Sequence, residues 1–146
     1  MTDLGDARLE ELRRRYLADH VRTATPGQRL LMLYDRLLDD LRGAQAAFGT
    51  MDRKAINDAL VHGQHVLFAL RDTLDTTVEI GRSLQGIYNF CLGQLLAANM
   101  EKDESLLPAC IEILEKLRDA NRQAVAAATQ EAATQRAVTQ EAAVVG

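Results

Sequence analysis

The 146-residue sequence contains no tryptophan, two prolines and two cysteines, and aromatic residues make up only 4% of it. Leucine and alanine dominate instead, and this mixture favours helices over sheets. The length fits one domain, and a domain of this size buries roughly two thirds of the surface that its unfolded chain exposes. Neither a metal nor a disulfide is therefore needed to hold it together.

A basic stripe is also missing. The net charge is −4, and acidic and basic residues alternate through most of the chain, so we expect no nucleic-acid partner. The N-terminal segment lacks the apolar core of a signal peptide, and no later run approaches 18 uncharged apolar residues. These features predict a soluble, cytoplasmic protein that does not insert into a membrane.

Motifs of catalytic sites are equally scarce. The Glu-x-x-His pairs of di-iron bundles, the usual nucleophile motifs and glycine-rich phosphate loops are all absent from the sequence. The nearest metal-ligating set is Asp58, His62 and His65, which leaves a metal-dependent enzyme as an alternative. These residues fall away from the apolar stripe of their predicted helix, which favours a solvated face. We therefore expect no enzyme and no cofactor.

Cys91 and Cys110 stand 19 residues apart, and neither has a second cysteine or histidine at metal-ligand spacing. The spacing favours two buried, reduced thiols that act as small apolar residues. A disulfide and a zinc site are the alternatives.

Apolar periodicity predicts four long helices after a short amphipathic segment at residues 6–20. The first helix begins at Thr25 as N-cap, with Pro26 at its first position and Gln28 completing a capping box. It runs to about Phe48, where Gly49 breaks it. Asp52 caps the second helix. A loop then spans residues 75–82.

The third helix is expected from Ser83 to near Glu101, and Asp103 caps the fourth, with Pro108 in or just after its first turn. Short loops between four helices predict an all-α fold, an antiparallel up-down four-helix bundle. From Thr129 a five-residue repeat, TQEAA-TQRAV-TQEAA, cannot hold one face of a helix, which indicates a frayed helical extension or a disordered tail. The chain thus divides into an N-terminal cap segment (1–22), the bundle (23–128) and a flexible low-complexity tail (129–146).

The predicted first helix has an unusually wide apolar face. Its leucines, Tyr34 and Phe48 span about 160° on a helical wheel, more than the roughly 100° that a surface helix needs, and Met32 falls opposite them. On the third helix Phe90, Leu96 and Met100 fall outside the inward face. The wide face fits either a helix covered by two neighbours or a groove for a helical partner.

The stretch YLADHVRTATPGQRLLMLYD, residues 16–35, resembles the signature of the FliS family of flagellar export chaperones. The resemblance continues through residues 59–74, 84–99 and 114–120, and it spans about residues 16–125. Two positions depart from the family pattern: Asn121 stands where members often have tryptophan, and Ile87 where they often have methionine. The alanine-rich tail has no counterpart in that pattern.

The resemblance implies a four-helix bundle that binds the C-terminal segment of newly made flagellin, prevents premature polymerisation and keeps it competent for flagellar type III export. A gate protein of the export apparatus is a further implied partner. A chaperone or adaptor for a different flagellar client, such as an anti-sigma factor, is the alternative. The oligomeric state is left open by the sequence.

We assign client contact to six residues on this basis: Tyr16, Val21, Met32, Tyr34, Tyr88 and Phe90. For Tyr34 and Tyr88 a place in the core is an equally good interpretation, because both lie on inward faces. Leu9, Leu12 and Tyr16 could also cover a groove of the free chaperone and move aside when the client arrives.

Overall fold

The fold is that of a computed structural model, which describes the backbone of residues 3–145 and the side chains of residues 5–15 and 24–144. Its elements are α1 (Asp3–Thr23), α2 (Pro26–Gly49), α3 (Arg53–Asp72), α4 (Glu79–Glu101), a 3₁₀ turn η1 (Glu104–Leu106) and α5 (Leu107–Val145). The described backbone contains no strand, so the predicted all-α class is confirmed.

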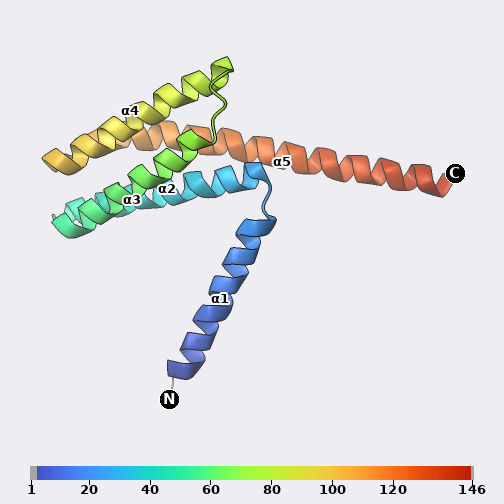
Figure 1. The fold of residues 1–146 in the computed structure, drawn as a ribbon, viewed down its shortest axis with the longest axis horizontal. Coiled ribbons are helices and arrows are strands. Elements are labelled where there is room, and N and C mark those ends of the chain that lie inside the picture. The colour runs from blue at the N-terminus through green and yellow to red at the C-terminus, as the bar shows by residue number, and fades with distance from the viewer. Residues whose placement is uncertain (1–2, 146) are drawn as a thin grey trace.

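Helices α2 to α5 pack side by side (Figure 1). α2 packs on both α3 and α5, α3 packs on α4, and α4 meets η1 and α5. Two elements reach beyond this group: α1 extends away from it, and the C-terminal part of α5 continues past the ends of the other helices (Figure 1). No helix in the described part of the chain is both long and apolar enough to cross a membrane.

The core is apolar apart from two tyrosine hydroxyls, and no described residue buries a charged side chain in it. Each of α2 to α5 contributes leucines, and isoleucine, valine, alanine, tyrosine, cysteine and phenylalanine side chains complete the core. The fully enclosed large side chains are Leu37, Leu38, Leu41, Ile56, Leu60, Leu67, Leu70, Tyr88, Cys91, Leu95, Leu107 and Leu114.

The start of α2 confirms the predicted capping box. The Gln28 amide donates to Thr25 Oγ1 at 3.2 Å, and the Thr25 amide donates to Gln28 Oε1 at 3.0 Å. Pro26 takes the first helical position, where its missing N–H costs nothing. α2 ends at Gly49, one residue beyond the predicted end, and Asp52 caps α3 as predicted.

The predicted start of the third helix at Ser83 is wrong, because α4 begins at Glu79. Its N-cap residue, Val78, makes no side-chain capping bond, so no polar residue marks the start in the sequence. Gly81 suggested a loop, yet it lies in the first turn of α4 against the preceding connection. A Cβ there would lie 1.8 Å from the Asp75 carbonyl oxygen, so the turn accommodates glycine alone.

The fourth predicted helix begins in two steps. Asp103 Oδ1 accepts from the Ser105 amide at 3.0 Å, which caps the 3₁₀ turn η1, and the α-helix proper starts at Leu107. Pro108 is the second residue of α5, inside the first turn as expected.

Both ends of the chain are more helical than predicted. α1 covers residues 3–23, and α5 continues without a break through the five-residue repeat, which corresponds to the helical extension rather than the disordered tail. The repeat is rich in alanine, glutamine and glutamate, which favour helices. Its threonines Thr129, Thr134 and Thr139 satisfy their hydroxyls by donating to the carbonyl four residues earlier.

We predict that Gly81→Ala destabilises the protein by about 3 kcal/mol, because the Asp75–Val78 connection must move away from the first turn of α4. Gly86→Ala is the matched control: it lies in the same helix, and its added Cβ meets nothing within 4 Å. This control should gain about 0.5–1 kcal/mol through helix propensity. Urea unfolding measures both changes, and equal stability of the two variants would contradict the assigned contact.

Candidate partner-binding surface

Tyr34 and Tyr88 meet inside the core and join α2 to α4. Their side chains are 3% and 1% exposed, their hydroxyl groups are hydrogen-bonded to each other, and their ring centroids lie 6.5 Å apart. Burial raises the pKa of both phenols above their ordinary value, so both stay neutral. Of the two interpretations of these tyrosines, the structure places both in the core.

The other four predicted contact residues have different surroundings. Phe90 is 47% exposed on α4, and Met32 is half-buried on α2. Tyr16 and Val21 belong to α1, but their side chains lie outside the described residues. The four described residues are therefore not one exposed patch, since Tyr34 and Tyr88 are buried while Phe90 is exposed.

Leu9 and Leu12 are 67% and 55% exposed, so these α1 side chains do not cover a groove in the arrangement of Figure 1. The sequence places apolar residues on α1 at helical spacing, but most of the remaining side chains of residues 5–15 are charged and all are exposed. Over residues 5–15 this helix therefore has too narrow an apolar face to be held in the core.

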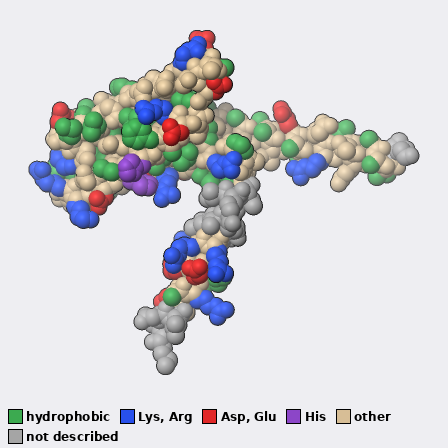
Figure 2. Space-filling view, in the orientation of Figure 1, with side chains coloured by type: hydrophobic (Ala, Val, Ile, Leu, Met, Phe, Trp, Pro, Cys, Tyr) green, Lys and Arg blue, Asp and Glu red, His purple; other side chains and the backbone are tan. Residues whose placement is uncertain are grey.

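An apolar surface does form along the outer seam between α3 and α4. Phe68 of α3 is 42% exposed and Leu96 of α4 is 50% exposed. Leu92, about one turn before Leu96 on α4, is half-buried. We call these three residues the α3–α4 surface. Figure 2 shows hydrophobic side chains gathered over these two helices.

Polar pairs cross from α3 to α4 toward both ends of this surface. Arg71 donates to Asn89 Oδ1 at 3.2 Å, and Asn99 donates to Asn57 Oδ1 at 2.9 Å. The two pairs hold α3 and α4 side by side, and the seam between the helices faces outward all the way from one pair to the other. Apolar residues at the centre and polar residues at the rim are typical of a partner-binding surface.

Arg71 also fixes the phenylalanine of this surface. Its guanidinium carbon lies 4.9 Å from the centroid of the Phe68 ring, a cation–π contact. The same side chain holds Asn89, so one arginine links the exposed ring to the neighbouring helix. Phe68 was not singled out from the sequence, because it lies outside the apolar stripe of its helix. A large aromatic residue outside that stripe was the signal that could have identified it.

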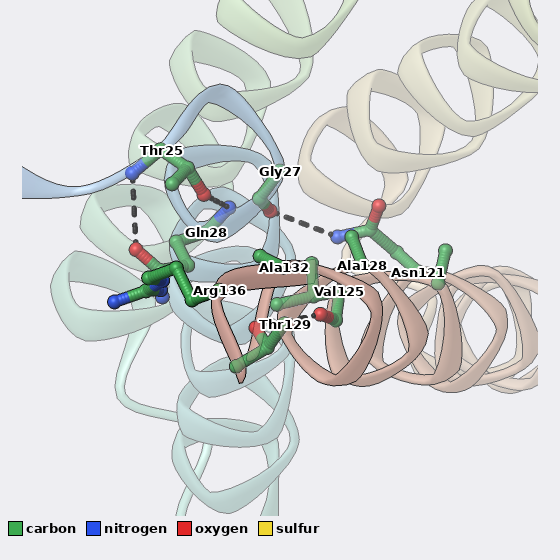
Figure 3. A pocket seen from close by; sticks show the side chains of 10 residues that line it. Thr25, Gly27, Gln28, Asn121, Val125, Ala128, Thr129, Ala132 and Arg136 are labelled. Atoms are coloured by element: carbon green, nitrogen blue, oxygen red, sulfur yellow. Dashed lines mark hydrogen bonds between the residues drawn. The ribbon is translucent and has the colours of Figure 1, made fainter. Parts of the chain in front are cut away.

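Two hollows flank the start of α2. One has a volume of about 510 Å³ and lies between residues 25–28 and the middle of α5, where Asn121 donates to the Gly27 carbonyl at 3.1 Å (Figure 3). The other, about 480 Å³, is lined by Leu30, Leu33 and Thr73 among others. The wide apolar face of α2 is thus core from Tyr34 onward, and its first turns border open hollows.

The alternative metal site does not assemble. His62 Nδ1 lies 2.5 Å from Asp40 Oδ2 on α2, whereas Asp58 pairs with Lys54 at 3.0 Å along its own helix. No group of three or more potential ligands gathers among the described side chains. Cys91 and Cys110 are free and buried, as the favoured interpretation predicted, and the neighbouring Cys110 thiol together with burial raises the pKa of the Cys91 thiol.

Known proteins with this fold and sequence define the class. A solved structure described as "Crystal structure of flagellar chaperone from bacteria" aligns with a TM-score of 0.65, covering 80% of this chain and 96% of that one, and at 19% identity this likeness shows the fold. The flagellar secretion chaperone FliS of Bacillus subtilis (strain 168) is 32% identical over 110 residues, which are 75% of this chain and 83% of the relative. The chain is thus one of the flagellar secretion chaperones.

The family follows from a third comparison. The sequence model of the family described as "Flagellar protein FliS" matches residues 9–128, more than three quarters of the chain. The chain belongs to the FliS family, as the motifs at residues 16–35 indicated.

We predict that Tyr34→Phe and Tyr88→Phe each cost about 1–3 kcal/mol, because each leaves one buried hydroxyl without a partner. The double variant Tyr34→Phe/Tyr88→Phe should cost clearly less than the sum of the two, since it removes both polar groups together. Thermal or urea unfolding of the four proteins measures this coupling. Additive losses would mean that the two hydroxyls do not depend on each other.

Proposed function

We propose that this protein binds the C-terminal segment of flagellin in the cytoplasm, prevents its premature polymerisation and keeps it competent for flagellar type III export. Membership of the FliS family supports the role of a flagellar secretion chaperone. The flagellin client comes from the resemblance of residues 16–35 and the later helices to that family's motifs. The proposal includes the antiparallel up-down bundle, with residues 23–128 as the chaperone domain between two appended segments.

The α3–α4 surface is the observation that carries the proposal. It presents Phe68, Leu92 and Leu96 between two polar pairs, which is the arrangement that the apolar face of a client helix would fill. Covering such a face on flagellin removes the side chains by which its subunits would associate. Phe90 and Met100 are also exposed on α4 and would extend contact to a client that wraps around the bundle.

The size of this surface fits a client that must be released. Fully burying one leucine or phenylalanine side chain contributes roughly 1.5–3 kcal/mol, and these side chains are already about half-covered. Ordering a disordered segment costs on the order of 2–5 kcal/mol. Binding therefore needs several such patches at once, and loss of any one of them weakens the whole complex.

The remaining predicted contacts have different parts in this proposal. Met32 at the edge of α2, and Tyr16 and Val21 of α1, would meet the client near the hollows at the start of α2. Tyr34 and Tyr88 support the surface from the core and would touch a client only if α2 and α4 separated. An export-gate protein remains a further proposed partner for the loaded complex.

A purified flagellin C-terminal peptide should form an equimolar complex at micromolar concentration, as measured by calorimetry. Leu96→Ser should weaken it at least about tenfold, because a side chain that would become buried is lost from the centre of the surface. The matched control is Met51→Asn, which removes an equally exposed apolar residue in a turn where φ is 49° and asparagine is well tolerated.

Failure of the wild-type protein to bind the peptide would overturn flagellin as the client and favour another flagellar client, such as an anti-sigma factor. Binding that both variants weaken equally, or that neither weakens, would keep the client and refute the α3–α4 surface. Unchanged helical content and melting temperature of each variant establish that the fold is intact.

A further inference from the structure

The C-terminal part of α5 forms one wall of the 510 Å³ hollow, which we call the α5 trough. It is lined along α5 from Asn121 to Arg136 and closed at its inner end by residues 25–28 (Figure 3). Beyond α2 this wall has no opposing helix in the arrangement of Figure 1. The family match ends at residue 128, so the outer half of the trough belongs to a segment outside it.

The contacts between α2 and α5 establish an antiparallel register that leads into the trough. Arg42 pairs with Glu115 at 2.8 Å, Arg118 lies 4.0 Å from Asp35, and Asn121 bonds to the Gly27 carbonyl. Residue numbers on α2 fall as those on α5 rise. Continued past the break at residues 24–25 from the Gly27–Asn121 contact, this direction brings residues 8–15 of α1 roughly opposite residues 133–140 of α5.

The described part of α1 carries a suitable face. Glu11, Leu12 and Arg15 lie at helical spacing on one side, and Leu12 is 55% exposed. Among the described side chains, Glu11 forms ion pairs only with Arg14 and Arg15 of its own helix, at 3.5 Å and 3.4 Å. These exposed pairs contribute little and are easily exchanged.

Charge on the two helices is complementary at this register. Glu11 comes within about one turn of Arg136, and Arg15 within about one turn of Glu131. Leu12 comes within about one turn of Ala132, whose small side chain lines the trough. Antiparallel packing also sets the two helix dipoles favourably. The covalent connection and the charges therefore point to the same register independently.

We propose that α1 docks antiparallel along the α5 trough of its own chain and continues the α2–α5 interface beyond the bundle. The arrangement in Figure 1, with α1 extended, is then the undocked one. Docking covers Leu12 and the alanine-rich wall together. This inference does not rest on the identity of the client.

Cross-linking in the full-length protein tests it. The variant Leu12→Cys/Ala132→Cys, treated with a short bismaleimide, should cross-link within the monomer at least about five times faster than Leu12→Cys/Gln130→Cys. Gln130 is two residues from Ala132 but lies roughly 160° around the helix, on the opposite side. Cys91 and Cys110 are fully buried and do not compete while the protein is folded.

The charge pair supplies a second readout. Arg136→Glu added to the Leu12→Cys/Ala132→Cys variant should slow cross-linking about threefold, and Glu11→Arg in the same protein should restore it. Equal rates for the two cysteine pairs, no cross-link at all, or no effect of the charge changes would overturn the proposal. A cross-linked dimer in place of the monomer would assign the trough to α1 of a second copy and refute docking within the chain.

Discussion

Two phenolic hydroxyls in an otherwise apolar core impose the strictest constraint on this protein. Each can be buried only because the other accepts or donates its hydrogen bond, so α2 and α4 must lie where Tyr34 and Tyr88 meet. The rotation of α4 about its axis is set by the same contact, since Tyr88, Cys91 and Leu95 share its inward face. Leu96 then has to face away from the centre of the core.

The exposed seam is therefore a consequence of how the core is built. Gly63 lets α3 approach closely enough that an added Cβ would lie 3.2 Å from Leu95 and 3.4 Å from Leu37, which brings three helices together at one level. The close packing around Gly63 leaves no room for Phe68 in the core, so Phe68 lies at the edge of α3 beside α4. The fold thus holds an apolar surface on rigid helices, already formed for the client that we propose.

Much of this fold could be predicted from local chemistry. Thr25, Pro26 and Gln28 predicted the start of α2 because a capping box acts within one turn, and Asp52 predicted α3 for the same reason. The start of α4 could not be predicted, since Val78 offers no capping side chain and Gly81 serves a contact with Asp75 that only the folded chain brings together. The exposure of Phe90 and Leu96 followed from helical periodicity, whereas the Tyr34–Tyr88 bond and the Arg71–Phe68 contact depend on packing between helices.

The central claim is that the seam between α3 and α4 receives the C-terminal segment of flagellin. Methyl NMR of the leucines during titration with that peptide tests this claim most directly. The account predicts that the methyl signals of Leu92 and Leu96 shift in proportion to bound peptide, and that those of the buried Leu41 change little. Shifts confined to leucines away from α3 and α4, with Leu92 and Leu96 unchanged in the saturated complex, would contradict it.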